Sequence, residues 1–238
     1  MNNSNYTLVF GGSKGIGLGL IQHFNLKKIN TISISRSVSE WTSKYNKHIT
    51  FDLIEFENYK FLLNELKKYK IDNVIFNLGD GSIVYEDKIK QYNYSLKINY
   101  LYAEKFIELI RKNNFKNLKN LVFINSICRF ENVNCKKEYR NSKSKLFELF
   151  KNNVLYFAEK NIKLNSITLG DVYHSNSIWK DKFSNKSEKL KYLKQTKLNK
   201  DFVNLSDVIS TVDFVINNSS LIGEDIVLDC GHLYLLDN

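Results

Sequence analysis

The stretch "VFGGSKGIGLGL", residues 9–20, decides how this chain folds. Three glycines, Gly11, Gly15 and Gly17, separate an apolar run typical of a β-strand from an amphipathic run typical of a helix. Such glycines permit a tight turn, a close approach of the main chain to a pyrophosphate, and close packing of the helix on the strand. The start of the helix then offers free N–H groups to phosphate. The stretch predicts a phosphate-binding turn, with a purely structural glycine-rich turn as the alternative.

Length and composition set the class of protein. The chain has 238 residues, of which 43% are hydrophobic, which suits one α/β domain over residues 1–238. No apolar run reaches the ~18 residues of a membrane helix. The start "MNNSNYTLVF" lacks the zones of a signal peptide. We expect a cytoplasmic protein without a membrane partner.

Cysteine, histidine and charge argue against two kinds of site. The three cysteines, Cys128, Cys135 and Cys230, form no C-x-x-C pair, and the four histidines are scattered, so we expect no disulfide framework and no metal. The net charge of +10 comes almost entirely from lysines spread along the chain. Because no arginine-rich stripe or dense basic block occurs, we attribute this charge to composition and expect no nucleic-acid partner.

Apolar runs and amphipathic stretches alternate along the chain. This alternation predicts α/β architecture, a doubly wound parallel sheet of about seven strands with right-handed crossovers. Residues 171–200 interrupt it with a polar, lysine-rich excursion, which we interpret as a substrate lid. The predicted strands are Tyr6–Phe10, Thr31–Ser35, His48–Phe51, Asn73–Phe76, Asn120–Asn125, Lys163–Thr168 and Asp225–Leu228. The predicted helices are Ile16–Leu26, Phe56–Tyr69, Lys88–Asn113, Lys137–Glu159 and Leu205–Asn217.

The glycine spacing resembles that of the short-chain dehydrogenase/reductase family, whose fingerprint is T-G-x-x-x-G-[IL]-G. This family also carries a serine followed about a dozen residues later by Y-x-x-x-K. The stretch "FINSICRFENVNCKKEYRNSK" supplies Ser126, Tyr139 and Lys143 at that spacing. Asn99 in "LKINYLYAE" falls where the family has its helix asparagine. The resemblance implies a Rossmann-type fold.

Further matches extend the resemblance over essentially the whole chain. "FNLG" at 76–79 resembles N-N-A-G, Asp52-Leu53 resembles the adenine-binding acidic motif, and "IKLNSITLG" and "GEDIVLDCG" resemble the two closing strands. Several positions depart from the family pattern, and we expect most of them beside the cofactor, where they would loosen its binding. These positions are Phe10, Phe76, Leu78, Leu169, His174 and Cys230.

The resemblance assigns roles to individual residues. Tyr139 is the proton donor, and nearby Lys143 brings its pKa down. Ser126 holds the carbonyl oxygen, and Asn99 holds a relay water, with backbone bridging as its alternative. Asp52 contacts adenine or caps the following helix. The implied catalytic residues are Asn99, Ser126, Tyr139 and Lys143. The implied cofactor-binding residues are Gly11, Ser13, Lys14, Gly15, Ile16, Gly17, Arg36, Asp52, Leu53, Asn77, Gly79, Tyr139, Lys143, Gly170 and Val172.

Two basic residues indicate which nicotinamide nucleotide is used. Arg36 stands just after the second strand, with no carboxylate before Glu40, and Lys14 lies in the glycine loop. NAD-specific relatives place an acidic residue after this strand, whereas basic residues clamp a 2′-phosphate. We therefore expect NADP(H), with two solvated surface charges as the alternative.

The resemblance implies an NADPH-dependent reductase that converts a ketone to a secondary alcohol, with a 3-oxoacyl thioester on acyl carrier protein as the first substrate class. A reductase tailoring a nucleotide-linked or surface sugar or a secondary metabolite is the alternative. A catalytically inactive NADP-sensing protein ranks lower. The lysines of the lid suit an anionic substrate or reflect composition. We expect a homotetramer or homodimer, because the predicted helix 137–159 and the end "HLYLLDN" carry more apolar side chains than one face needs.

Overall fold

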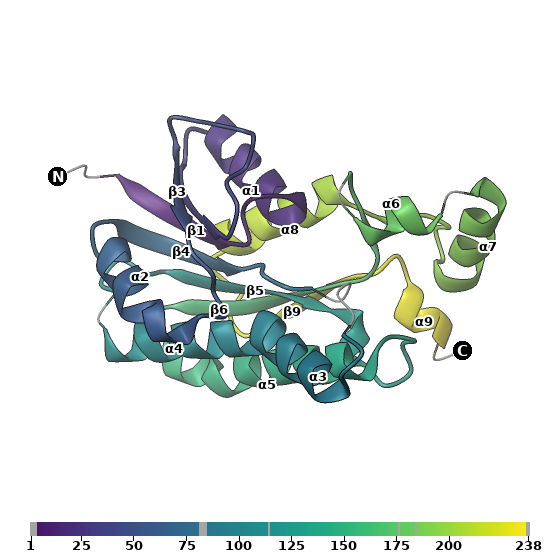
Figure 1. Cartoon of the computed structure of the whole chain (residues 1–238). Helices are drawn as coiled ribbons and strands as arrows, with labels where there is room; N and C mark the ends of the chain where they lie inside the picture. Colours follow the sequence, from purple (N-terminus) through teal and green to yellow (C-terminus); the bar gives the residue numbers. More distant parts are fainter. Residues whose placement is uncertain (1–3, 81–84, 114, 176, 184, 237–238) are drawn as a thin grey trace.

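Seven parallel strands form the centre of the protein (Figure 1). The structure is a computed structural model that describes residues 4–80, 85–113, 115–175, 177–183 and 185–236. The order of the strands across the sheet is β3-β2-β1-β4-β5-β6-β9. The predicted Rossmann-type sheet is therefore confirmed. The strands are β1 (Asn5–Phe10), β2 (Asn30–Ser35), β3 (Asn46–Thr50), β4 (Lys70–Phe76), β5 (Asn120–Ser126), β6 (Lys163–Leu169) and β9 (Asp225–Leu228).

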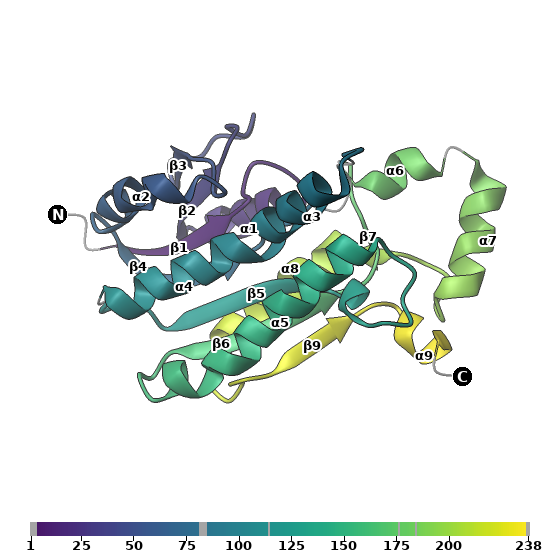
Figure 2. The same cartoon turned by 60° about the horizontal axis from the view of Figure 1, so that its bottom comes forward.

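Helices cover both faces of this sheet (Figures 1 and 2). On one face α1 (Gly15–Leu26) and α8 (Leu205–Asn217) enclose an apolar cluster that includes Leu20 and Val212. On the other face α2 (Tyr59–Leu66), α4 (Tyr102–Lys112) and α5 (Lys137–Ala158) enclose a larger one. The two-sided burial explains why the central strands read as continuous apolar runs.

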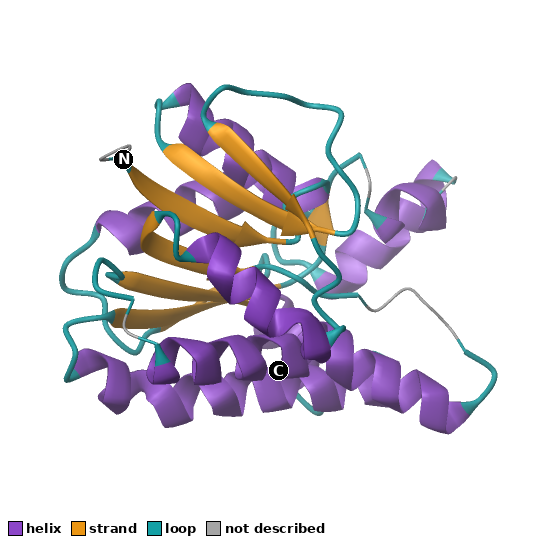
Figure 3. Ribbon diagram, turned by 60° about the vertical axis from the view of Figure 1, so that its left-hand side comes forward, coloured by secondary structure: helices purple, strands orange, loops and turns teal. Residues whose placement is uncertain are grey.

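The direction of strand addition reverses beside β1. Figure 3 shows the strands side by side in one twisted sheet, with helices on both sides. The chain proceeds from β1 outward to β2 and β3, and then returns to place β4 on the other side of β1. In parallel sheets of this kind, ligands bind in the crevice outside the carboxyl ends of the strands at such a switch point. The glycine loop after β1 and the residues that follow β4, β5 and β6 all belong to this edge.

The remaining elements refine the predicted boundaries. The predicted helix 88–113 is α3 (Lys88–Leu96), a π-helical turn η2 (Lys97–Leu101) and α4. The predicted helix 56–69 starts as a 3-10 turn, η1 (Phe56–Asn58), before α2. The lid segment, residues 171–200, contains β7 (Val172–Tyr173), α6 (Ile178–Lys182) and α7 (Lys186–Thr196), with positions 176 and 184 outside the described residues. β8 (Val203–Asn204) pairs with β7, and α9 (His232–Leu236) follows β9.

Two of the departures from the family pattern, Phe10 and Phe76, lie in the core. Phe10 and Phe76 are fully buried and pack with their ring centroids 5.4 Å apart. Phe76 also stacks on Phe123, with centroids 4.6 Å apart, and both Phe10 and Phe76 contact Phe106 on α4. Neighbouring strands therefore carry matched rings that fill the space under α4, and the expected effect of these two residues on cofactor binding stays a prediction.

The apolar residues of α5 are mostly covered by the chain itself. Leu146, Phe150 and Phe157 are buried, and of the seven apolar residues between positions 146 and 157, Leu155 alone is exposed. At the chain end, Tyr234 and Leu236 of α9 are exposed. Within the described residues, no helix combines the length and apolar character that crossing a lipid bilayer requires.

Phe76 offers a direct test of this core. Phe76→Ala removes a fully buried ring from between Phe10 and Phe123, and we expect it to lower the free energy of unfolding by about 3–5 kcal/mol. Urea unfolding followed by circular dichroism measures the loss. The exposed Phe61→Ala, on α2, serves as the control and should stay within about 0.5 kcal/mol of the wild type. Equal losses for both variants would contradict the packing described here.

Candidate active site

The glycine loop has backbone angles that favour glycine at two places. Gly11 and Gly15 have φ of 74° and 56°. A Cβ on Gly17 would lie 2.2 Å from the carbonyl oxygen of Gly11, so any side chain there would force α1 away from β1. At the N-terminus of α1, Lys14 provides no side-chain cap, and the first turn holds no acidic residue. Its N–H groups are thus available to a phosphate, which fits the dinucleotide cradle that the sequence predicts.

The loop after β2 lies against the glycine loop. The hydroxyl of Ser37 donates a hydrogen bond to that of Ser13 at 3.4 Å. Lys14 and Arg36, next to these serines in the chain, are both exposed. The two predicted basic residues therefore flank one joined surface. Sequence reasoning missed Ser37, although its position directly after Arg36 was a usable signal.

His174 of the lid segment packs on the glycine loop. A Cβ on Gly15 would lie 2.8 Å from Cε1 of the His174 imidazole, so the ring rests on the bare glycine backbone. Burial lowers the pKa of His174, and the charge of Lys14 lowers it further. This contact connects the lid segment to the glycine loop.

The loop after β4 joins the glycine loop to the catalytic candidates. The side-chain amide of Asn77 donates to the carbonyl oxygen of Gly11 at 3.3 Å. A Cβ on Gly79 would lie 3.0 Å from Nζ of Lys143 and 3.1 Å from Oδ1 of Asn99. Glycine at position 79 therefore lets the lysine and the asparagine approach the main chain of this loop.

Asn99 lies within the π-helical turn η2 and is fully buried. Its Oδ1 accepts a hydrogen bond from the backbone N–H of Asp80 at 2.9 Å, and its Nδ2 donates to the carbonyl oxygens of Asp80 and Ser95 at 3.1 and 3.0 Å. The side chain thus bridges the β4 loop to α3, which is the backbone-bridging role left open by the sequence. Single π-turns inside helices occur frequently at functional sites.

Ser126, Tyr139 and Lys143 meet at the carboxyl end of β5. Ser126 is the last residue of β5, while Tyr139 and Lys143 share one face of α5. Nζ of Lys143 lies 5.8 Å from the ring centroid of Tyr139 and donates to the carbonyl oxygen of Ile124 at 3.4 Å. The Ser126 hydroxyl also interacts with the Tyr139 phenol. The four predicted catalytic residues are thus brought together with the β4 loop.

Burial sets the protonation of the two titratable groups. It raises the pKa of Tyr139, and the hydrogen bond with Ser126 opposes that rise only in part. The direction is opposite to the one that the sequence predicted, because desolvation of a phenolate outweighs its neighbours here. Burial also lowers the pKa of Lys143 to about 8. In the protein without cofactor, the phenol is therefore a protonated group at neutral pH.

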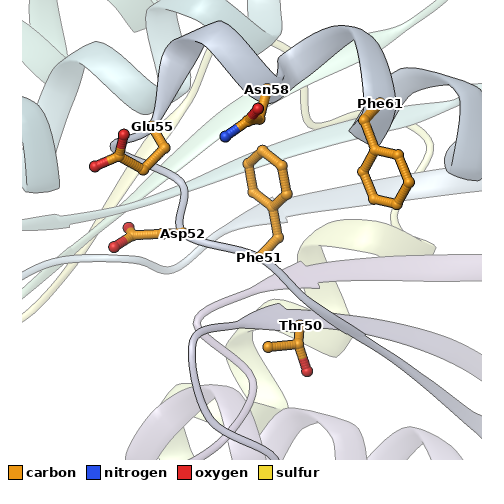
Figure 4. A pocket seen from close by; sticks show the side chains of 6 residues that line it. All are labelled: Thr50, Phe51, Asp52, Glu55, Asn58 and Phe61. Carbon is orange, nitrogen blue, oxygen red and sulfur yellow. The ribbon is translucent and has the colours of Figure 1, made fainter.

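Asp52 and Leu53 lie after the edge strand β3, apart from the catalytic group. The Asp52 carboxylate accepts a hydrogen bond from the N–H of Ile54 at 3.2 Å, while α2 starts later, so Asp52 is not its N-cap. Asp52 and Glu55 place their carboxylates along one side of a hollow of about 260 Å³ (Figure 4). Thr50, Phe51, Asn58 and Phe61 complete its lining. Leu53 is buried.

A buried ion pair ties the lid segment to the end of β6. Lys197 has a fully buried side chain, and its Nζ lies 2.7 Å from Oδ2 of Asp171, the residue after Gly170. The Tyr192 hydroxyl donates to the same oxygen at 2.6 Å, and Lys197 donates to Nδ1 of His232 at 2.8 Å. Val172, the next residue of the chain, is buried in β7. This network was not foreseen, since its members lie far apart in the sequence.

An aromatic cluster forms the interior of the lid. Trp179 stacks on Phe183 and on Tyr192, with centroids 5.9 and 5.3 Å apart, and Phe202 contacts all three rings. Nζ of Lys182 lies 4.7 Å from the centroid of Trp179. Part of the lysine content of this segment therefore covers aromatic rings. Among the residues that the structure describes, no three His, Cys, Asp or Glu side chains gather where they could hold a metal ion.

Comparison with protein families now fixes the relationship. The model of the NAD dependent epimerase/dehydratase family matches residues 7–162, from β1 to just before β6. This chain belongs to the NAD dependent epimerase/dehydratase family. The matched region includes the glycine loop, Asn99, Ser126, Tyr139 and Lys143. A search of curated protein sequences gave no match.

Several solved structures share the fold of this chain. A short chain dehydrogenase family protein from Francisella tularensis is 22% identical, with a TM-score of 0.82 over 97% of this chain and 99% of that one. A 4-hydroxyisoleucine dehydrogenase complexed with NADH is 21% identical, with a TM-score of 0.87 over 97% and 99%. L-sorbose reductase from Gluconobacter frateurii, complexed with NADPH and L-sorbose, is 15% identical, with a TM-score of 0.82 over 97% and 97%. These neighbours share the fold of this chain over nearly its whole length.

Lys143 provides a test of the electrostatics of the site. Its pKa of about 8 lies well below that of a free lysine. At pH 7 the lysine is charged in both the folded and the unfolded protein, and burying that charge lowers the free energy of unfolding by roughly 3 kcal/mol. Between pH 8 and about pH 10.5, Lys143 is mostly neutral in the folded protein and mostly protonated in the unfolded chain. The free energy of unfolding therefore rises with pH across this range, until the penalty for burying the charge is gone.

We therefore expect Lys143→Met to be more stable than the wild type at pH 7 and to lose that advantage near pH 10.5. Urea unfolding at both pH values measures the difference. The exposed Lys151→Met on the same helix is the control and should show no such pH-dependent gain. A Lys143→Met variant that is less stable than the wild type at pH 7 would show that hydrogen bonding outweighs desolvation there.

Proposed function

We propose that this protein is an NADPH-dependent oxidoreductase that reduces a ketone to a secondary alcohol. The observation that carries the proposal is the meeting of Ser126, Tyr139, Lys143 and Asn99 at the sheet edge where the glycine loop opens the N-terminus of α1. The candidate catalytic residues and the phosphate-binding loop then lie at the same edge of the sheet, as hydride transfer from a nicotinamide nucleotide requires.

The residues present fit such a nucleotide. The glycine loop and the uncapped α1 suit the pyrophosphate, Lys143 suits ribose hydroxyls, and Asp52, beside an open hollow, suits the amino group of adenine. The nucleotide, when bound, supplies the hydride. The chain binds and orients the nucleotide, and it donates the proton.

The protein's own part of the reaction is proton donation. Burial keeps the Tyr139 phenol protonated, so that it can donate a proton from its hydroxyl to the oxygen of a carbonyl substrate. The Ser126 hydroxyl, next to the phenol, donates a hydrogen bond to the same oxygen as negative charge develops there. A charged Lys143 then favours the phenolate that is left, and Asn99 holds the β4 loop against the lysine.

The preference for NADPH rests on charge beside the glycine loop. Lys14 and Arg36 are exposed cations on loops that Ser13 and Ser37 join. An arginine binds phosphate through two parallel charge-assisted hydrogen bonds. The name of the family refers to NAD, and the structural neighbours include complexes with either nucleotide, so the choice of NADP(H) is our proposal from these residues.

For the substrate, the first candidate remains a 3-oxoacyl thioester presented by an acidic carrier, which the basic surface of the lid suits. A nucleotide-linked or surface sugar, or a secondary metabolite, is the second candidate. The epimerase/dehydratase match and the likeness to a reductase complexed with L-sorbose favour this second class. An inactive NADP-sensing protein ranks lower, because the full set of catalytic residues is retained. We also propose a homodimer or homotetramer, supported by exposed Leu155, Tyr234 and Leu236.

Tyr139→Phe tests the chemistry. The ring keeps its packing while the acid is lost, so we expect turnover with a panel of ketones and NADPH to fall by ~10²–10⁴-fold, with nearly unchanged NADPH affinity. NADPH fluorescence reports binding, and loss of absorbance at the nicotinamide band reports turnover. The control is Tyr45→Phe, outside the site. Turnover of Tyr139→Phe above about a tenth of the wild type would refute the role of the phenol.

Arg36→Ala tests the cofactor preference. Loss of a charge-assisted bond costs about 1.5–3 kcal/mol, so NADPH affinity should fall by roughly 10- to 100-fold while NADH affinity changes little. Lys14→Ala should act in the same direction, and the exposed Lys151→Ala should have no effect. Fluorescence titration with both nucleotides measures all four proteins. Equal losses for NADPH and NADH would show that Arg36 does not contact the 2′-phosphate.

A further inference from the structure

Two thiols lie on the segment that connects Ser126 to Tyr139. Cys128 belongs to the 3-10 turn η3 (Ile127–Arg129), and Cys135 lies just before α5. The backbone N–H of Cys128 donates to the Ser126 hydroxyl at 3.2 Å, and Sγ of Cys135 donates to the carbonyl oxygen of Cys128 at 3.4 Å. Both cysteines are free and partly exposed. A small reagent therefore has access to a pair of neighbouring thiols.

The two thiols differ in reactivity. A hydrogen bond from Cys128 lowers the pKa of Cys135 to about 7, burial opposes the shift, and the charge of Arg140 adds to it. The same interaction, together with burial, raises the pKa of Cys128. The thiolate is the nucleophile in thiol–disulfide exchange. At neutral pH, Cys135 is thus the attacking thiol and Cys128 the one held ready beside it.

We propose that Cys128 and Cys135 form a modification site, a dithiol that low-molecular-weight disulfides oxidise to an intramolecular disulfide. The Cys135 thiolate attacks one sulfur of the reagent, forms a mixed disulfide and releases the first thiol of the reagent. Cys128 then gives up its proton and attacks Sγ of Cys135, which releases the second. The protein loses two electrons and two protons, and the reagent gains them as two thiols. The two cysteines are seven positions apart, so the disulfide closes a short loop.

Closing this loop affects the site that holds the substrate oxygen. The charges of Cys128 and Cys135 both act on the Tyr139 phenol, and the Cys128 amide is bonded to the Ser126 hydroxyl. A disulfide removes the charge of the Cys135 thiolate and constrains the backbone that binds the Ser126 hydroxyl. Neither cysteine belongs to the glycine loop or to the Arg36 loop. We expect the oxidised protein to lose carbonyl reduction and to keep NADPH binding, a consequence that rests on the proposed function, whereas the disulfide itself does not.

The third cysteine is the internal control. Cys230 follows β9, and it interacts with Asn199 and Lys197 of the lid segment. Burial raises its pKa, so it should react more slowly than Cys135. The matched variants are Cys128→Ser, Cys135→Ser and Cys230→Ser, with Cys135→Ala as a replacement if the serine variant fails to fold.

The reduced full-length protein is treated with oxidised glutathione at pH 7.5. Acid then stops the thiol–disulfide exchange, and a maleimide blocks the remaining thiols. Trypsin fragments are analysed by mass spectrometry. Because Arg129 lies between the two cysteines, trypsin leaves two peptides that only a disulfide can join. We expect the joined peptides in the wild type and in Cys230→Ser. Cys128→Ser should stop at a glutathione adduct on Cys135, and Cys135→Ser should give neither product.

Absence of the joined peptides from the oxidised wild type, or glutathione addition at Cys230 ahead of Cys135, would overturn the proposal. The activity measurement is separate. Turnover should fall in step with the joined peptides and return after dithiothreitol, while NADPH titration stays unchanged. Unchanged turnover of the fully oxidised protein would overturn the link to Tyr139. A reduced wild type that lacks any turnover would instead count against the proposed function, and the joined peptides would still test the thiol pair independently.

Discussion

The close contact between α1 and β1 is the constraint on which the rest of the structure depends. Gly17 leaves only the space of a hydrogen atom beside the carbonyl oxygen of Gly11, and Asn77 from the next strand bonds that same oxygen. The turn between them can then be tight, and the N-terminus of α1 faces the carboxyl edge of the sheet. Because every strand of the sheet is parallel, the ends of β4, β5 and β6 reach the same edge. One packing contact thereby brings the proposed phosphate-binding loop and the proposed proton donor to the same edge of the sheet.

Function at this edge imposes a cost in stability. A buried lysine and a half-buried tyrosine lie where their charged forms are disfavoured, which lowers the pKa of Lys143 and raises that of Tyr139. Their neighbours offset only part of this cost. The lid repeats the pattern with Lys197, whose buried charge is matched by Asp171. Buried polar groups of this kind specify one arrangement of loops that apolar packing alone would leave free.

Much of this fold could be predicted from the sequence, since periodic apolar runs report burial on two faces. All seven strands of the sheet and the five long helical stretches were recovered with small differences at their ends. The π-turn at Asn99 was not, because it depends on hydrogen bonds to Asp80, which a helical periodicity does not encode. The contact between Phe10 and Phe76 was not foreseen for a related reason: each departs from the family pattern alone, and only their mutual packing accounts for both.

The candidate site could be predicted where the sequence resembles the short-chain dehydrogenase/reductase motif, as at Ser126, Tyr139 and Lys143. It was not predictable where distant segments meet, as in the contact of His174 with Gly15. The most direct test of the whole account is a crystal structure of the protein with NADPH. We expect the 2′-phosphate between the side chains of Lys14 and Arg36, and the nicotinamide beside Tyr139 and Lys143. A nucleotide bound elsewhere, or a 2′-phosphate that contacts neither basic residue, would contradict it.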